Sequence, residues 1–249
     1  MTVYFIGAGP GDPELVTVKG QRLIQRCPVI IYAGSLVPVA LLENHTAERV
    51  VNSAELDLQA IIEEMAQAHA KGHDVARVHS GDPSLYGAIG EQIRCLQARG
   101  IPFEIVPGVT AVAACAALLG SELTLPGISQ TVILTRYGSR SPMPPGEALA
   151  DLARHRATMA IHLGVSHLPD IVATLAPCYG ADCPVAVIHK ATWPGQDWVL
   201  GTLADIQQKV EGKGFRRTAL ILVGRVLGND VFEDSALYRA GKAHLYRPG

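Results

Sequence analysis

The amino-acid sequence predicts an α/β fold built from two α/β domains. Short apolar runs alternate with helical segments through the first half of the 249-residue chain, which predicts a mostly parallel sheet. Several of these runs end directly in loops that contain glycine and proline. Near residue 120 the expected strands become longer and the loops richer in proline. We therefore place the domains at 1–113 and 114–249, the first with a mainly parallel sheet and the second with a mixed one.

The first half of the chain is expected to alternate regularly between strands and helices. The expected strands are 3–6, 29–32, 74–79 and 103–106, and the expected helices are 15–26, 55–71, 87–99 and an alanine-rich helix that opens at 107–110 and runs to Leu119. The clearest helix is 55–71, because Leu58, Ile62 and Met65 share one face and Gly72 ends it.

The second half is expected to continue the alternation with longer strands. The expected strands are 130–135, 158–163, 185–189 and 219–223, and the expected helices are 144–154, 166–175 and 203–210. No internal repeat or low-complexity segment interrupts this pattern.

A glycine-rich turn follows the first strand, at Gly7, Gly9 and Gly11. Glycines at the carboxyl end of a parallel strand allow a ligand to approach the main chain, because no Cβ stands in the way. A dinucleotide site would need a further glycine where Asp12 stands, and Pro10 lacks the amide that a phosphate would accept from. The turn taken alone is equally compatible with a plain strand-to-helix connection.

The composition of the chain indicates which kinds of partner and which cellular compartment to expect. The net charge of −2 predicts no nucleic-acid partner. No apolar run approaches the length of a membrane span, and no secretory signal is recognisable, so we expect no membrane partner. The five cysteines are an odd number, widely spread and without a CxxC pair, which is typical of a reducing cytoplasm.

Common hydrolytic and metal-dependent sites find little support in the sequence. A GxSxG elbow and a phosphate-binding loop with its lysine are both missing. His69 and His73 have a metal-like spacing, but Gly72 interrupts their helix, and Cys178 and Cys183 lack histidine partners at zinc-site spacing. We therefore expect no metal.

Three motifs resemble those of the tetrapyrrole (corrin/porphyrin) methyltransferase family. They are Gly-Ala-Gly-Pro-Gly-Asp-Pro at 7–13, continued by 15–20; Ser-Gly-Asp-Pro at 80–83, continued by Tyr-Gly at 86–87; and Val-Pro-Gly-Val-Thr-Ala at 106–111. They occur in the family's order, and the resemblance extends to about Gly228. It implies the tetrapyrrole methylase fold of class III methyltransferases, with a ligand cleft between two α/β domains, S-adenosylmethionine as methyl donor, S-adenosylhomocysteine as product, a tetrapyrrole substrate and a cytoplasmic homodimer.

Two further stretches, 32–37 and 122–131 with its continuation to 144, resemble the branch of the family that methylates C11 of precorrin-4 to give precorrin-5 in cobalamin biosynthesis. Cobalt-precorrin-4 and another precorrin ring carbon stay open as alternatives. A nicotinamide-dependent oxidoreductase and a non-catalytic nucleotide-binding module are more distant alternatives, the first opposed by Asp12.

The family's binding positions can be carried over residue by residue. The resemblance suggests donor contacts at Pro10, Ser80, Gly81, Asp82, Pro83, Thr110, Ala111, Leu163, Ala191 and Ala219. Leu163 departs from the pattern, since many relatives have methionine there, but the two side chains are similar in volume. Asp82 is a candidate general base, although its place in the donor motif favours a hydrogen-bonding role.

Substrate contacts are expected at the glycine turn and at two arginines. Gly9 and Gly11 are placed at the floor of the site, and Arg136 and Arg140 can pair bidentately with the carboxylates of a tetrapyrrole. The alternative for both arginines is a solvated loop charge.

Overall fold

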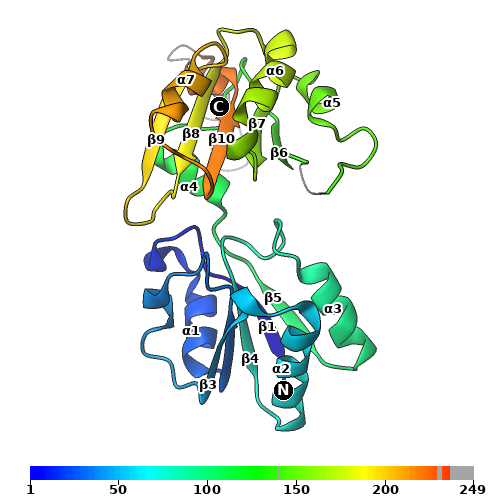
Figure 1. Ribbon diagram of the computed structural model, residues 1–249. Helices are drawn as coiled ribbons and strands as arrows, with labels where there is room; N and C mark the ends of the chain where they lie inside the picture. Colours follow the sequence, from blue (N-terminus) through cyan, green and yellow to red (C-terminus); the bar gives the residue numbers. More distant parts are fainter. Residues whose placement is uncertain (139–140, 229–231, 236–249) are drawn as a thin grey trace, which may run out of the picture. The chain divides into compact units, whose positions relative to one another are not determined.

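The structure is a computed structural model that describes residues 1–138, 141–228 and 232–235. Figure 1 traces the chain, with most of its α-helices and strands labelled. The α/β class predicted from the sequence is confirmed, because the described residues form two five-stranded sheets with helices between their strands. Within the described residues, no helix combines the length and apolar character needed to cross a membrane.

The chain divides into two compact units. The first contains Met1–Ala114 together with Thr192–Pro194, and the second contains Cys115–Ala191 and the chain from Gly195 onward. The sequence prediction assigned all of 114–249 to a second domain. The structure differs at Thr192–Pro194, because Trp193 packs on the glycine turn of the first unit.

The sheet of the first unit is entirely parallel, in the order β3-β2-β4-β1-β5. Its strands are β1 (Val3–Gly7), β2 (Val29–Tyr32), β3 (Arg49–Asn52), β4 (Val75–His79) and β5 (Phe103–Val106). Gly7 pairs with His79, and Ile6 pairs with Val106. The loops that follow β1, β4 and β5 therefore leave the sheet at one edge.

Helices cover both faces of this sheet. They are α1 (Val18–Arg26), α2 (Leu58–Ala70) and α3 (Ile89–Ala98), with short 3-10 helices η1 (Pro13–Leu15), η2 (Val39–Leu42) and η3 (Ser53–Glu55). The next helix, α4 (Ala111–Leu118), contains the boundary between the two units, after Ala114. One apolar cluster joins the sheet to α1 and η2, and another joins it to α2 and α3. The helix predicted to begin at residue 15 begins at Val18, because the Thr17 side chain caps it by accepting from the amide of Gly20 at 3.1 Å.

The sheet of the second unit is mixed, in the order β6-β7-β10-β8-β9. Its strands are β6 (Val132–Arg136), β7 (Thr158–His162), β8 (Pro184–His189), β9 (Asp197–Thr202) and β10 (Ala219–Val223). β6 and β7 are parallel, whereas β10 is antiparallel to both β7 and β8. The start of β10 therefore lies beside the end of β8.

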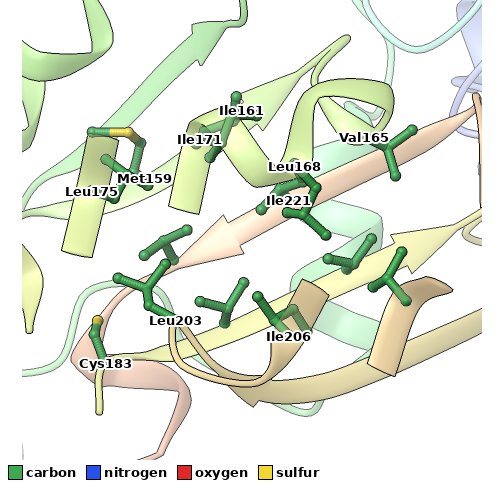
Figure 2. Packing of buried hydrophobic residues seen from close by; sticks show 14 of the residues in the cluster. Met159, Ile161, Val165, Leu168, Ile171, Leu175, Cys183, Leu203, Ile206 and Ile221 are labelled. Carbon is green, nitrogen blue, oxygen red and sulfur yellow. The ribbon is translucent and has the colours of Figure 1, made fainter. Parts of the chain in front are cut away.

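One face of the second sheet packs against its helices. These are α5 (Leu149–Ala153), α6 (Leu168–Tyr179) and α7 (Ile206–Glu211), with the 3-10 helices η4 (Val165–His167) and η5 (Arg225–Leu227). Figure 2 shows how Met159 and Ile161 of β7 meet Ile171 and Leu175 of α6 in the apolar core. The candidate residues of this unit follow or begin strands that belong to this buried cluster.

Candidate functional site

Three glycines bring the loops after β1, β4 and β5 into direct backbone contact. A Cβ on Gly7 would lie 2.5 Å from the Cα of Gly108, and a Cβ on Gly108 would lie 2.1 Å from the carbonyl oxygen of Gly81. Neither position has room for a side chain. The glycines of three separate motifs therefore form one packed edge.

Gly9 and Gly81 are joined by main-chain hydrogen bonds across this edge. The amide of Gly81 donates to the carbonyl of Gly9 at 2.7 Å, and the amide of Gly9 donates back at 3.3 Å. Both residues have positive φ, +79° and +60°, where glycine is favoured. A Cβ on Gly81 would meet only one atom within 4 Å, the Val109 carbonyl oxygen at 3.9 Å. The surface beside Gly81 is thus open main chain.

Asp82 ties the loop after β4 to the loop after β5. Its Oδ1 accepts from the amide of Ser84 at 2.8 Å, and its Oδ2 accepts from the amide of Gly108 at 2.9 Å. Both carboxylate oxygens thus hold backbone, and this geometry favours a positioning role over proton transfer. Ser80 is half-buried next to this loop and Pro83 is buried within it.

The glycine turn is held by residues that the sequence did not indicate. The indole Nε1 of Trp193 donates to the carbonyl of Pro10 at 2.7 Å, and the hydroxyl of Thr192 accepts from the amide of Asp12 at 3.0 Å. A Cβ on Gly11 would lie 2.3 Å from Trp193, so the packing of this indole accounts for glycine there. The Trp-Pro pair in the loop before β9 was the available signal.

Thr110 and Ala111 begin the alanine-rich helix at the same edge. The hydroxyl of Thr110 accepts from the amide of Ala113 at 3.3 Å and so caps α4. The helix begins within five residues of β5, which brings both candidates to the carboxyl end of the sheet.

Three candidates of the second unit come together at one edge of its sheet. Ala219 pairs with His189 at the end of β8, two residues before Ala191. Leu163 directly follows β7, and extending the β7–β10 register places it opposite Ala219. The amide of Lys190 donates to the carbonyl of Thr218 at 2.9 Å and closes this corner.

Leu163 has two unusual properties. Its side chain is 67% exposed, and its backbone has a φ of +56°. A left-handed leucine is unfavourable by roughly 1–2 kcal/mol, and strained backbone of this kind clusters at functional sites. Ala191, by contrast, is buried.

Arg136 lies at the same edge, where it pairs in the sheet with His162. Its guanidinium donates to the carbonyls of Ser141 and Pro142 at 3.1 and 3.4 Å, and it forms no ion pair within the described residues. Burial lowers the pKa of His162, so this histidine is neutral at pH 7. Arg140 lies outside the described residues.

Nothing in the described parts of the chain gathers three or more histidine, cysteine, aspartate or glutamate side chains in a geometry that could hold a metal ion. The described candidate residues offer main chain, apolar side chains, the hydroxyls of Ser80 and Thr110, the carboxylate of Asp82 and the guanidinium of Arg136.

Comparison with known proteins identifies the family. Residues 2–207 match the profile of the tetrapyrrole (corrin/porphyrin) methylases. The chain is 73% identical to the precorrin-4 C(11)-methyltransferase of Pseudomonas aeruginosa over 249 residues, all of both chains. Among solved structures it resembles a cobalamin biosynthetic enzyme, cobalt precorrin-4 methyltransferase, with a TM-score of 0.89 and 42% identity over 92% of this chain and 96% of the other.

A second solved structure contains a ligand. The uroporphyrin-III C-methyltransferase of Thermus thermophilus, complexed with S-adenosyl homocysteine, is 31% identical with a TM-score of 0.74, over 91% of this chain and 99% of the other. The profile match and these full-length similarities agree with the motifs at the glycine-lined edge. The chain is a member of the tetrapyrrole (corrin/porphyrin) methylase family.

Proposed function

We propose that this methyltransferase transfers the methyl group of S-adenosylmethionine to C11 of precorrin-4, giving precorrin-5 in cobalamin biosynthesis. The observation that carries the proposal is the 73% identity, over all of both chains, to an enzyme named for that reaction. The second candidate is the same methylation of cobalt-precorrin-4, favoured by the 42% identity and high structural similarity to an enzyme named for that substrate. Membership of a methylase family argues against the nicotinamide-dependent alternative.

The chemistry of the glycine-lined edge fits the proposed donor. S-adenosylmethionine supplies an electrophilic methyl group on a sulfonium, and its nucleoside and amino-acid parts offer several hydrogen-bonding groups. The open main chain beside Gly81 suits such a ligand, because amides and carbonyls can be reached without a Cβ in the way. Asp82 keeps this edge in shape through its bonds to Ser84 and Gly108.

We propose specific donor and substrate contacts on this basis. In the first unit the donor contacts are Pro10, Ser80, Gly81, Asp82, Pro83, Thr110 and Ala111, and in the second unit they are Leu163, Ala191 and Ala219. Gly9, Gly11, Arg136 and Arg140 are the proposed substrate contacts. For Gly11 the packing of Trp193 is an additional reason for glycine.

The proposed reaction asks the chain to orient its ligands rather than to attack. The nucleophile is a carbon of the macrocycle, so no serine, cysteine or lysine nucleophile is required. Holding two reactants in a near-attack geometry can contribute roughly 7–11 kcal/mol to lowering the barrier. The packed glycines and the bonds of Asp82 and Trp193 provide the rigidity that such positioning needs.

The decisive experiment is transfer of a labelled methyl group from S-adenosylmethionine to a panel of tetrapyrroles. The panel contains precorrin-4, cobalt-precorrin-4, precorrin-3 and uroporphyrinogen III. We expect precorrin-4 to be methylated with the highest kcat/KM and the label to be found on C11. Preference for cobalt-precorrin-4 would support the second candidate, and label on another carbon would contradict the proposed position.

We further propose that the protein works as a cytoplasmic homodimer. All five cysteines are free in the structure, as is usual in a reducing compartment. Light scattering of the purified protein at several concentrations should give twice the chain mass of 26.4 kDa. A single-chain mass at all concentrations would contradict the dimer.

A further inference from the structure

A cavity of about 350 Å³ lies in the first unit beside the carboxyl ends of β2 and β4, on the sheet face covered by α2 and α3. Its wall includes Ser53, Arg77, His79, Ala88 and Glu91, and we call it the β2–β4 cavity. Of the proposed donor contacts only Ser80 also lines it. The cavity is thus largely separate from the residues proposed to bind the methyl donor.

Arg77 is a buried cation in this wall whose partners are all neutral. The residue is 4% exposed, its Nε donates to Oε1 of Gln92 at 3.0 Å, and its Nη1 donates to Oγ of Ser53 at 3.0 Å and to the carbonyl of Ile31 at 3.4 Å. No carboxylate in the described residues forms an ion pair with it, and none of these bonds uses Nη2.

The charge on Arg77 persists despite this burial. Burial lowers its pKa to about 10, which still leaves the guanidinium protonated at pH 7. A buried charge without a counter-charge is unfavourable, so an anion entering the cavity would be stabilised there.

His79 stands two residues further along β4, on the same face of the strand as Arg77. It is 5% exposed, and its Nε2 is buried without a hydrogen-bond partner in the described chain. Burial and the charge of Arg77 lower its pKa to about 3, so the ring is neutral at pH 7. A neutral imidazole that carries its proton on Nε2 can donate to an anion in the cavity.

The N-terminus of α3 also opens at the cavity. This ten-residue helix has Ala88 as its N-cap, with a left-handed φ of 50° and no side-chain capping bond. Its first amides and the positive end of its dipole favour a negative charge. Glu91 on the wall is exposed and forms no ion pair with Arg77 in the described structure, so it leaves that cation uncompensated.

We propose that the β2–β4 cavity binds a carboxylate, one of the acetate or propionate side chains of the tetrapyrrole substrate, with Arg77 and His79 as its main donors. The identity of the carboxylate rests on the proposed function. The volume of the cavity suits one carboxylate-bearing arm and is too small for the whole macrocycle. The anion would sit near the positive charge of Arg77 and complete the bonding of His79.

The first test is an NMR titration of the His79 imidazole in the full chain, assigned by comparison with His79→Phe. The probes are uroporphyrin III, its octamethyl ester, sodium propionate and S-adenosylhomocysteine. We expect uroporphyrin III to shift the Nε2 signal and raise the pKa of His79, because a nearby anion favours the protonated ring. The octamethyl ester and S-adenosylhomocysteine should leave both unchanged.

The outcomes of this titration separate the possible sources of the carboxylate. A response to S-adenosylhomocysteine but not to uroporphyrin III would assign the cavity to the donor's carboxylate and overturn the proposal. Equal responses to uroporphyrin III and its octamethyl ester would show that no carboxylate is recognised. No response to any carboxylate at saturation would also overturn it.

The second test measures binding by two variants with matched controls. We expect Arg77→Lys and His79→Phe to weaken uroporphyrin III binding about tenfold or more, since each loses a hydrogen bond to a charged group. Binding of S-adenosylhomocysteine should not change, which a general disturbance of the fold would not allow. The controls are Arg94→Lys on the exposed side of α3 and His69→Phe on α2, neither of which lines the cavity.

Carboxylate binding in the β2–β4 cavity and methylation of precorrin-4 are measured separately, so one can fail without the other. Methylation of precorrin-4 with an unresponsive His79 would remove the carboxylate site and leave the activity. A responsive His79 in a protein that does not methylate precorrin-4 would leave the carboxylate site and remove the activity.

Discussion

Trp193 acts on the glycine turn at the scale of a single side chain, through one hydrogen bond and one packing contact. Replacing Trp193 with phenylalanine removes the bond to the carbonyl of Pro10 but keeps an aromatic ring over Gly11. We expect the free energy of unfolding to fall by about 1 kcal/mol. Binding of S-adenosylhomocysteine, measured by calorimetry, should weaken several-fold because the turn loses its anchor.

Trp198→Phe is the matched control for this change, because Trp198 is 40% exposed on β9. It should leave both quantities unchanged. An unchanged affinity in Trp193→Phe would mean that the indole stabilises the turn without shaping a ligand site.

Gly108 offers a test of the backbone contacts at the same edge. In Gly108→Ala the new Cβ would lie 2.1 Å from the carbonyl oxygen of Gly81, so the two loops must separate. We expect a loss of roughly 1–3 kcal/mol in the free energy of unfolding, measured by urea titration.

Gly90→Ala is the control, since a Cβ there meets no atom within 4 Å and alanine is the better helix former. It should stabilise the protein by up to about 1 kcal/mol. Equal effects of the two substitutions would contradict the close approach at Gly108.

At the scale of elements, Asp82 connects the loops after β4 and β5. Asp82→Ala frees the amides of Ser84 and Gly108, so the two loops lose their shared anchor. We expect binding of S-adenosylhomocysteine, measured by calorimetry, to weaken at least tenfold. Normal binding with slow turnover would instead assign Asp82 the role of general base.

Leu163 tests whether the corner after β7 is strained for function. Leu163→Gly relieves the left-handed backbone and removes a side chain that is 67% exposed, so the melting temperature should stay the same or rise. Donor affinity should fall, because the proposed apolar contact is lost. A lower melting temperature with unchanged affinity would show that Leu163 is a structural residue.

The sequence predicted most elements of both sheets, because their central strands are buried apolar runs next to glycine or proline. It missed β3 and β9, which are edge strands. β3 consists of Arg49, Val50, Val51 and Asn52, so it lacks the continuous apolar run of the central strands. In β9, Trp198 and Leu200 alternate with smaller residues, which is a strand pattern. The segment directly follows a loop, and the sequence prediction included it in that loop.

The candidate residues could be placed from the sequence only where a short motif directly follows a predicted strand. Gly9, Gly81 and Asp82 could be placed because each follows a strand. The role of Trp193 depends on its hydrogen bond to Pro10, which lies 183 positions away in the chain. The environment of His79 depends on Arg77 and on residues of η3, α2 and α3 that line the same cavity. No local pattern encodes such contacts.

Three histidines with lowered pKa values, one buried and two half-buried, should make the protein sensitive to acid. The pKa values of His79, His162 and His189 are all lowered, with burial as the largest cause, and that of His79 falls from 6.5 to about 3. Below pH 6.5 these histidines bind protons in the unfolded chain but not in the folded one. The free energy of unfolding therefore decreases as the pH is lowered, until the pKa of the folded state is reached. His79 alone should contribute about 1.4 kcal/mol per pH unit between those limits.

Urea midpoints measured from pH 7 to pH 3 would check this dependence. The slope should be shallower in His79→Phe, whereas His69→Phe should keep it. Lowered carboxylate pKa values, such as that of Asp182 beside Arg225, act in the same direction: their stabilisation is present above the unfolded pKa and is lost as pH falls through the folded one. A midpoint that does not change over this range would contradict the burial of neutral His79.

Because Thr192–Pro194 belongs to the first unit, the gene cannot be divided into two units by a single cut. A cut after Ala114 would separate the glycine turn from the tripeptide that anchors it, so the amino-terminal half would lack a part encoded about 80 codons downstream. Domain shuffling and split reporters must therefore keep both pieces together. The two halves of this enzyme cannot be exchanged independently between relatives. A chimaera has to take Thr192–Pro194 and the glycine turn from the same parent.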